Sequence, residues 1–272
     1  DRACLEAMSG FAKSADNDIV AAYGDIFIKS AVLKTAYRAI LTNKKRGFLE
    51  EALPDIPEIK KADLIDASLQ GTDALYDFVS SLGLESFAEA LKNSPSAFEK
   101  YCDDAVMENM KKARENADIV IVSCHWGIEY DYHPNTFQKN MAKQLADAGA
   151  DVIIGTHTHT LQDVEYIQRA DGKRTLVAYS LGNFVSGMLE ESCQLEGMLS
   201  FDIEKKKIKN VVFTPLVNYY TLTGKKERHD FSVYRLKDYT NKLVEKHGFP
   251  NLTIPHMKEK AKQKVKNIKI DM

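Results

Sequence analysis

The stretch VIIGTHTHTLQ, residues 152–162, decides how the chain can be interpreted. A run of β-branched apolar residues, typical of a buried strand, stops at Gly155 and is followed by His157 and His159. Imidazoles at such a position are well suited to a divalent metal, because one ring nitrogen can bind the ion while a backbone carbonyl fixes the other. Gly155 would permit the tight turn that brings the loop close to the ion.

A second strand of the same kind ends in a histidine earlier in the chain. In VIVSCHWGIEY, residues 120–130, His125 follows alternating apolar and small residues, and a helical pattern at 136–150 separates the two strands. Strand, helix and strand in this order predict parallel strands, whose carboxyl ends meet at one edge where ligands bind. We therefore expect His125, His157 and His159 to converge on a metal site. Since two-metal hydrolytic sites hold their ions ~3.5–4 Å apart, each histidine of the pair could serve one ion.

The composition is that of an ordinary globular protein. The 272 residues are 44% hydrophobic and 28% charged, which is enough to bury a sizeable core. A net charge of −2 disfavours a nucleic-acid partner, and no apolar run approaches the ~20 residues of a membrane helix. The 4 cysteines contain no CxxC pair, which favours free thiols and a reducing compartment. Because no linker is evident, we predict one domain over residues 1–272.

The remaining pattern is mixed α/β. Parallel strands in the middle of the chain are followed by strands that look antiparallel. The elements expected, in chain order, are a helix at 2–14, a short strand at 18–28, mostly helix from about 30 to 117 with Ser94 and Pro95 at one helix start, a strand at 174–185, a hairpin at 197–219 with Lys205–Lys207 at its tip, and a lysine-rich solvated helix or arm at 257–272.

The other histidines stand in polar surroundings. His133, His229, His247 and His256 are therefore interpreted as surface or loop residues. Trp126 is expected to fill the core beside the site.

Three segments together resemble one protein family. SCHWGIEYDYHP (123–134), FQKNMAKQLADAGADVIIGTHTHTLQDVE (137–165) and VAYSLGNFV (177–185) resemble, in order and spacing, the bacterial CapA (PgsA-type) capsule-synthesis proteins. That family is associated with poly-γ-glutamate capsules and belongs to the calcineurin-like metallophosphoesterase superfamily. The resemblance is strongest over residues 116–219, and its specificity lies in the combination of HWGxEY, GxHxH and SLGNF.

The resemblance implies a four-layer α/β/β/α sandwich with a dinuclear metal site between loops at one edge of the sheets. His125, His157 and His159 would be metal ligands, while Thr156 stands where the family's closing motif begins and is not a ligand. Imidazole and carboxylate ligands suit Mn, Fe or Zn better than Ca.

The resemblance also implies roles for residues around the metals. Glu129 would be catalytic, accepting a proton or orienting a water molecule. Tyr130 and Asn183 would border the substrate pocket, and Gln162 would contribute to substrate binding by holding the loop after the histidines.

Family members also carry an early Gly-Asp, an Asn-x-Glu and an Asn-Asn-His segment, and the last two have no convincing counterpart here. One explanation is that the N-terminal part of the domain is absent from this chain. The other is that AAYGDIFI supplies the early motif, with Asp25 as a ligand, and that the middle motifs have been replaced. We favour the first explanation and expect this chain by itself to bind metal weakly.

The predicted function is that of a CapA-like protein that hydrolyses a phosphoester or handles a polyanionic γ-glutamyl polymer. The alternative is a non-catalytic binding protein on the same scaffold, with a degraded metal site. The expected partners are the phosphoester or polymer and a capsule-synthesis membrane complex. Localisation would be at the cell surface if an N-terminal anchor precedes this sequence, and cytoplasmic otherwise.

Overall fold

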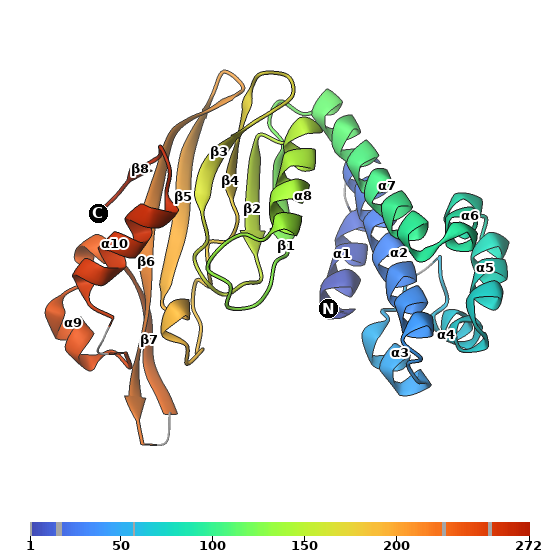
Figure 1. Cartoon of the computed structure of the whole chain (residues 1–272), viewed down its shortest axis with the longest axis horizontal. Coiled ribbons are helices and arrows are strands. Elements are labelled where there is room, and N and C mark those ends of the chain that lie inside the picture. The colour runs from blue at the N-terminus through green and yellow to red at the C-terminus, as the bar shows by residue number, and fades with distance from the viewer. Residues whose placement is uncertain (1, 15–17, 57, 225–226, 250–251) are drawn as a thin grey trace. The chain divides into compact units, whose positions relative to one another are not determined.

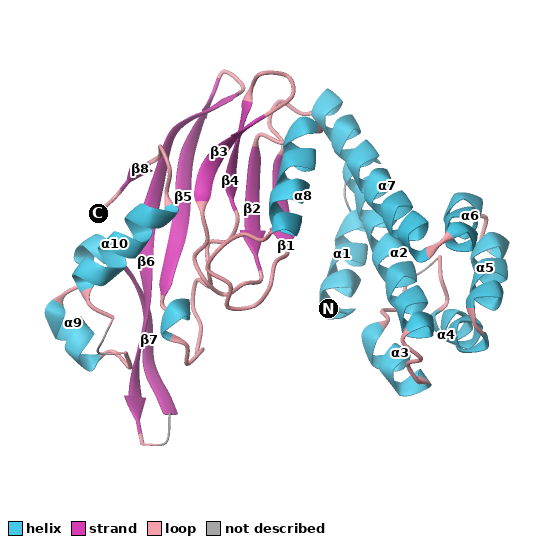
Figure 2. Cartoon of the chain, viewed as in Figure 1, coloured by secondary structure: helices cyan, strands magenta, loops and turns pink. Residues whose placement is uncertain are grey.

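The computed structural model describes residues 2–14, 18–56, 58–224, 227–249 and 252–272. Its Cα positions cluster into two compact units, Asp1–Glu115 and Asn116–Met272 (Figure 1). Helices and two sheets make the protein mixed α/β, which confirms the α/β class predicted from the sequence (Figure 2). The prediction of one domain over the whole chain stays a prediction, because compactness does not decide whether the two units act together.

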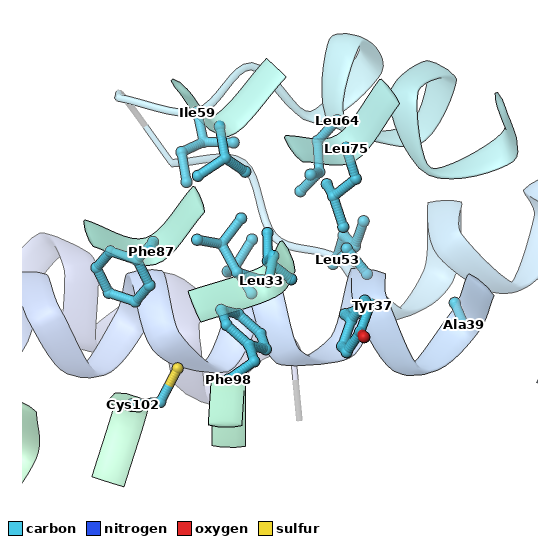
Figure 3. Close-up of a cluster of buried hydrophobic side chains, with 14 of the residues drawn as sticks. Leu33, Tyr37, Ala39, Leu53, Ile59, Leu64, Leu75, Phe87, Phe98 and Cys102 are labelled. Carbon is cyan, nitrogen blue, oxygen red and sulfur yellow. The ribbon is translucent and has the colours of Figure 1, made fainter. Parts of the chain in front are cut away.

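The first unit consists of helices in the part of it that the structure describes. The helices are α1 (Arg2–Ser14), α2 (Asp18–Leu41), α3 (Arg46–Ala52), α4 (Lys61–Gln70), α5 (Thr72–Ser81), α6 (Glu85–Asn93) and α7 (Pro95–Asn116). Their apolar side chains meet around Leu33, Tyr37, Phe87 and Phe98 (Figure 3). The rings of Tyr37 and Phe98 lie 5.4 Å apart in an edge-on arrangement, so this core is held by close aromatic and aliphatic packing.

The strand predicted at 18–28 is wrong, because these residues begin the long helix α2. The apolar run continues with helical spacing, and Ile28, Val32 and Ala36 are all buried, so burial along one helix face decides the structure. Asp25 therefore lies inside a helix, where its carboxylate pairs with Lys29 at 2.7 Å.

One helix start in this unit was predicted correctly. The Oγ of Ser94 accepts a hydrogen bond from the backbone N–H of Ala97 at 3.0 Å, and Pro95 is the first residue of α7. The hydroxyl satisfies one of the backbone donors that a helix leaves free at its start, and proline is tolerated there because its missing N–H is not needed.

In the second unit, one sheet carries the predicted parallel strands. Its strand order is β1-β2-β4-β3, with β1 parallel to β2, β2 parallel to β4, and β3 antiparallel to β4. The elements are β1 (Ile121–His125), α8 (Thr136–Asp147), β2 (Val152–Thr156), β3 (Val164–Gln168) and β4 (Arg174–Ala178). The crossover helix α8 contacts β3 and β4. The carboxyl ends of β1, β2 and β4 therefore meet at one edge, as the sequence pattern requires.

The other sheet contains the predicted hairpin. Lys205 and Lys206 link its long antiparallel strands with positive φ angles of 47° and 64°, the conformation that matches the natural twist of a hairpin. Strand order is β5-β6-β7, and β8 pairs with β6. The elements are η1 (Glu191–Cys193), β5 (Leu195–Glu204), β6 (Lys207–Thr223), β7 (Glu227–Arg235), η2 (Leu236–Asp238), α9 (Asn241–Lys246), α10 (Ile254–Lys264) and β8 (Lys269–Ile270).

Side chains from both sheets enter one hydrophobic core, which includes Val152 and Leu176 from the first sheet and Phe213 and Val217 from the second. The lysine-rich tail, predicted to be solvated, contributes to the same core. In α10, Met257 and Ala261 are fully buried and Lys264 is buried as well, so one face of this lysine-rich helix is packed, while Lys262 is exposed.

None of the helices within the described ranges has the length and hydropathy of a membrane-spanning segment.

Candidate functional site

The three histidines predicted to converge lie at the ends of neighbouring strands. His125 is the last residue of β1 and is in register with Thr156, the last residue of β2, and His157 and His159 follow directly. The ring centroids of His125 and His157 are 4.5 Å apart, and those of His157 and His159 are 6.2 Å apart. The structure thus brings together the three imidazoles singled out in the sequence.

The backbone at this edge adopts a conformation that is unusual for its residues. His157, His159 and Tyr130 have φ angles of 97°, 61° and 68°. Residues other than glycine rarely occupy this left-handed region, and the local cost of order 1–3 kcal/mol persists only where the surrounding structure fixes it. The two histidines after β2 are therefore held in orientations that a relaxed loop would not choose.

Gly155 has a different role from the one predicted. It lies inside β2 rather than at a turn, because the strand continues to Thr156. A Cβ at Gly155 would come within 1.9 Å of the Tyr179 carbonyl oxygen and 2.4 Å of Nε1 of Trp126. The Trp126 indole donates a hydrogen bond of 2.8 Å to that same carbonyl. Glycine is needed here so that the tryptophan can cross the strand and hold the ends of β1 and β4 together.

His159 is fixed by Asn183, which lies in the SLGNF segment after β4. Nδ1 of the imidazole is 2.8 Å from Oδ1 of Asn183, and the amide Nδ2 of Asn183 donates to the backbone carbonyl of His159 at 3.3 Å. With the amide oxygen facing Nδ1, the neutral form of the ring carries its proton on Nδ1 and leaves the lone pair on Nε2. A ring nitrogen held in this form can act as a base or as a metal ligand.

Glu129 lies beside that free nitrogen. Its Oε1 is 3.7 Å from Nε2 of His159, beyond a direct hydrogen bond but close enough for both to contact one ligand or water molecule. The carboxylate is about half exposed, with a relative side-chain area of 54%. The ring of Tyr130 is 6.2 Å from that of His159 and borders the same edge.

The electrostatics at His125 favour its neutral form. Partial burial lowers the pKa of its imidazole below the ordinary value, and the neighbouring His157 and His159 lower that pKa further. A proton bound to His125 would be repelled by any positive charge on the other two rings. An uncharged imidazole at neutral pH is the form that can bind a metal ion or accept a proton.

A hydrogen-bonded network holds the β1–α8 loop, residues 126–135, against the histidine segment. The backbone N–H of Tyr130 donates to the Thr158 carbonyl at 2.8 Å, and the carbonyl of Asp131 accepts from Thr160 Oγ1 at 2.6 Å and from Gln162 Nε2 at 2.9 Å. The side chain of Gln162 is fully buried, and its contact with Asp131 holds the β1–α8 loop.

Gln138 links this network to the start of α8. Its Nε2 donates to Oε1 of Gln162 at 2.8 Å, and its backbone N–H is capped by the Asn135 side chain at 2.9 Å. The sequence pattern did not single out Gln138, which is fully buried, whereas its apolar neighbour Phe137 is exposed. The start of α8 is thus built around a polar contact to the loop and not around an apolar stripe.

The fit of a metal ion to these residues is partial. The three imidazoles offer nitrogen ligands, but among the described side chains no group of three or more histidine, cysteine, aspartate or glutamate residues is arranged to hold a metal ion. The described residues therefore do not make a complete metal centre by themselves.

Two hollows lie near the histidine edge, the sheet edge that carries His125, His157 and His159. One, of about 370 Å³, is lined by apolar side chains together with Gly182 and Asn183. The other, of about 710 Å³, lies beside the β1–α8 loop and carries both acids and lysines, including Asp131, Glu191 and Lys260. Its mixed charge selects no ligand class, and none of the three histidines lines it, so the geometry of the strand ends defines the candidate site better than the larger cavity does.

One of the histidines interpreted as a surface residue is buried. His247 is only 4% exposed, its Nδ1 lies 3.1 Å from the hydroxyl of Tyr239, and burial lowers its pKa to about 4. Its neighbours Lys246 and Gly248 gave no sign of this, because the aromatic rings around it come from β6, from Tyr239 just after η2 and from Phe249 after α9. His229 and His133 are exposed, as predicted.

The second unit is therefore a mixed α/β structure with a histidine-bearing edge at the carboxyl ends of its parallel strands. The family model described as bacterial capsule synthesis protein PGA_cap matches residues 84–188. This match covers the histidines, the β1–α8 loop and the segment that carries Asn183.

Curated relatives support the same family. The chain is 34% identical over 128 residues to "PGA biosynthesis protein CapA" of Bacillus subtilis (strain 168), an alignment that covers 47% of this chain and 32% of that protein. It is 43% identical over 86 residues to "Capsule biosynthesis protein CapA" of Bacillus anthracis, covering 30% of this chain and 20% of that protein. These matches confirm the resemblance to CapA-type capsule synthesis proteins. They span only about a third or less of each relative's length.

Proposed function

We propose that this chain is a CapA-like protein of capsule or poly-γ-glutamate synthesis, with the histidine edge as its working site. The observation that carries the proposal is the convergence of His125, His157 and His159 at adjacent strand ends, within the part of the chain that matches the capsule synthesis family. The finer architecture proposed is the metallophosphoesterase sandwich, and the two sheets with a shared core support it.

The chemistry proposed for this edge is binding or cleavage of an anionic substrate, either a phosphoester or a γ-glutamyl polymer. In this proposal His159, whose Nδ1 contacts Asn183, accepts a proton or a ligand at Nε2. In this proposal Glu129 orients a water molecule or accepts a proton from it, and Tyr130 borders the substrate; both side chains lie beside His159. These roles depend only on the side chains of this chain.

A dinuclear centre with Mn, Fe or Zn is part of this proposal, with the three histidines as its nitrogen ligands. When bound, such ions would supply an activated water molecule for hydrolysis. Because the described side chains do not complete a ligand group, the oxygen ligands would have to come from outside them.

A paramagnetic titration tests the histidine edge even when binding is weak. Mn²⁺ added in small amounts should broaden the imidazole NMR signals of His125, His157 and His159 before that of His229, whose ring is about half exposed. Changing His157 and His159 together to alanine should abolish the selective broadening at His125, while His229→Ala should leave it unchanged. If His229 broadens as early as the three clustered rings, the histidine edge is no metal site.

A second candidate is a non-catalytic binding protein on the same scaffold. The incomplete ligand group favours it. Hydrolysis of bis(p-nitrophenyl) phosphate with Mn²⁺, compared with binding of a γ-glutamyl polymer, separates the two candidates. Turnover that disappears in the His157→Ala, His159→Ala double variant supports an enzyme, whereas polymer binding without turnover supports the binding protein.

A further inference from the structure

Beneath the histidine edge lies a carboxyl group that the proposed chemistry does not use. Glu196, the second residue of β5, is fully buried, and neither of its carboxyl oxygens has a hydrogen-bond partner of ordinary geometry among the described residues. Burying an acid in this way is costly, and such a group in a folded protein calls for an explanation.

The carboxyl group lies against the turn that follows β4. Gly182 in this turn has a φ of 78°, and a Cβ added to it would come within 2.1 Å of Oε2 of Glu196. Only glycine therefore lets the acid and the turn approach this closely. The next residue of β5 contributes as well, because the backbone N–H of Gly197 donates to the Leu181 carbonyl at 2.9 Å. The start of β5 thus meets the turn with both backbone and side chain.

The same turn delivers Asn183 to His159. The amide of Asn183 contacts both Nδ1 and the backbone carbonyl of His159, at 2.8 and 3.3 Å. We propose that Glu196 is a positioning residue: its side chain holds the turn at Gly182 and Asn183, and through Asn183 it fixes the ring of His159. Glu196 itself touches no substrate.

The charge state of Glu196 suits this role. Burial raises the pKa of its carboxyl group to about 9, and the nearby backbone N–H of Asn183 lowers that pKa only partly. The Asn183 N–H is thus close enough to attract the Glu196 carboxyl group electrostatically, although the pair does not reach ordinary hydrogen-bond geometry. At neutral pH the acid is protonated, so that it can pack under the turn without an uncompensated charge.

This inference rests on the proposed function only in that it takes His159 as a working residue. The approach of Glu196 to the turn at Gly182 and the contacts from Asn183 to His159 do not involve a metal ion. A test that measures the state of the imidazole directly can therefore fail or succeed whatever the Mn²⁺ titration shows.

The test compares three variants by long-range ¹H–¹⁵N NMR of the histidine rings, with His159→Gln used to assign the signal. In the unchanged protein, His159 should show a single pattern with the proton on Nδ1. Glu196→Gln, which keeps the size and neutrality of the protonated acid, should keep that pattern. Glu196→Met, which keeps the length but removes both oxygens, should shift His159 toward a mixture with the Nε2–H form. Leu195→Ala, a neighbouring core change whose side chain lies on the other face of β5, should destabilise the protein and leave the pattern unchanged.

Two results would overturn the inference. One is an unchanged His159 pattern in Glu196→Met, and the other is an equal change in Leu195→Ala. Infrared spectroscopy adds an independent check: the carbonyl stretch of a protonated carboxylic acid should be present at neutral pH and absent in Glu196→Gln. Absence of that band from the unchanged protein would refute the protonated state.

Discussion

The two units of the molecule bury different kinds of side chain. In the helical unit the core is apolar, and the buried polar side chains that the structure describes there are the hydroxyls of Ser30 and Ser68. Ser68 bonds back to its own helix, at the Leu64 carbonyl. In the second unit, amides and ionisable groups are buried among the strands, including Gln138, Gln162, Gln194, Glu196, Asn218, His247 and Lys264.

The two kinds of core have different effects: one mainly stabilises the fold, and the other mainly selects one conformation. An apolar core stabilises through the area it removes from water, and its members can be exchanged at modest cost if volume is kept. Buried polar groups contribute little net energy when they are satisfied, but they fix one arrangement because the alternatives leave them unpaired. Around the histidine edge these groups hold loops and turns, so the second unit has the features of a site and the first has those of a packed scaffold.

The largest predicted effect is a matched pair of core truncations, one in each unit. Phe98 and Phe213 are both fully buried, and changing either to alanine should cost about 3–5 kcal/mol of unfolding free energy. Phe98→Ala should leave the His159 ring signals unchanged. Phe213→Ala should shift them, because the Phe213 ring packs against Gly197, whose N–H holds the turn before Asn183. Denaturant titration and imidazole NMR on both variants measure the two effects.

If Phe98→Ala moves the His159 signals as much as Phe213→Ala does, the contrast between scaffold and site is wrong. The helical unit would then have to be counted as part of the site's support.

The next effect concerns acid stability and His247. Burial lowers the pKa of this imidazole from 6.5 to about 4, so the unfolded chain binds its proton at a higher pH than the folded protein does. Between those two values the unfolded state holds more protons, and stability falls as pH decreases from about 6.5 toward 4. The difference corresponds to about 3 kcal/mol, at 1.36 kcal/mol per pKa unit.

His247→Phe should remove most of that acid dependence, because the aromatic rings of Tyr219, Tyr220 and Phe249 can accept another ring at this place. His229→Phe, at an exposed position, should keep the acid dependence of the unchanged protein. Denaturation curves at several pH values between 4 and 7 make the measurement, and equal acid dependence in His247→Phe and the unchanged protein would contradict the burial of this group.

The parts of this fold that sequence predicted are those fixed by local pattern. The parallel strands ending in His125 and His157 follow from apolar runs separated by a helical period, and the hairpin turn at Lys205 and Lys206 follows from its strands. The strand predicted around Asp25 failed because its apolar run is too short to show its period, and the longer helical spacing becomes clear only further along α2.

What sequence could not show is which polar residues are buried. Glu196 and His247 sit in segments whose neighbours alternate like any strand or loop, and their burial depends on rings and turns far away in the chain. Gly182 was a partial sign of this packing, because a glycine is needed where the Glu196 carboxyl group approaches the turn. No local sequence pattern, however, identifies Glu196 as the residue that approaches. Site residues on strand ends were predictable because topology brings them together, whereas their supports depend on three-dimensional packing.

The smallest predicted effect compares the two helix caps. Ser94 caps α7 in the helical unit and Asn135 caps α8 in the second unit, each through one side-chain oxygen on a backbone N–H. Changing either to alanine should cost about 1 kcal/mol. Asn135→Ala should in addition shift the His159 signals, because Gln138, the residue that it caps, bonds to Gln162 in the network that holds the β1–α8 loop. The expected result is that both variants lose the same stability and that only Asn135→Ala shifts the His159 signals. The cap at Ser94 would then stabilise only its helix, whereas the cap at Asn135 would also support the site. A shift in neither variant would mean that the Gln138–Gln162 contact holds α8 without holding the site.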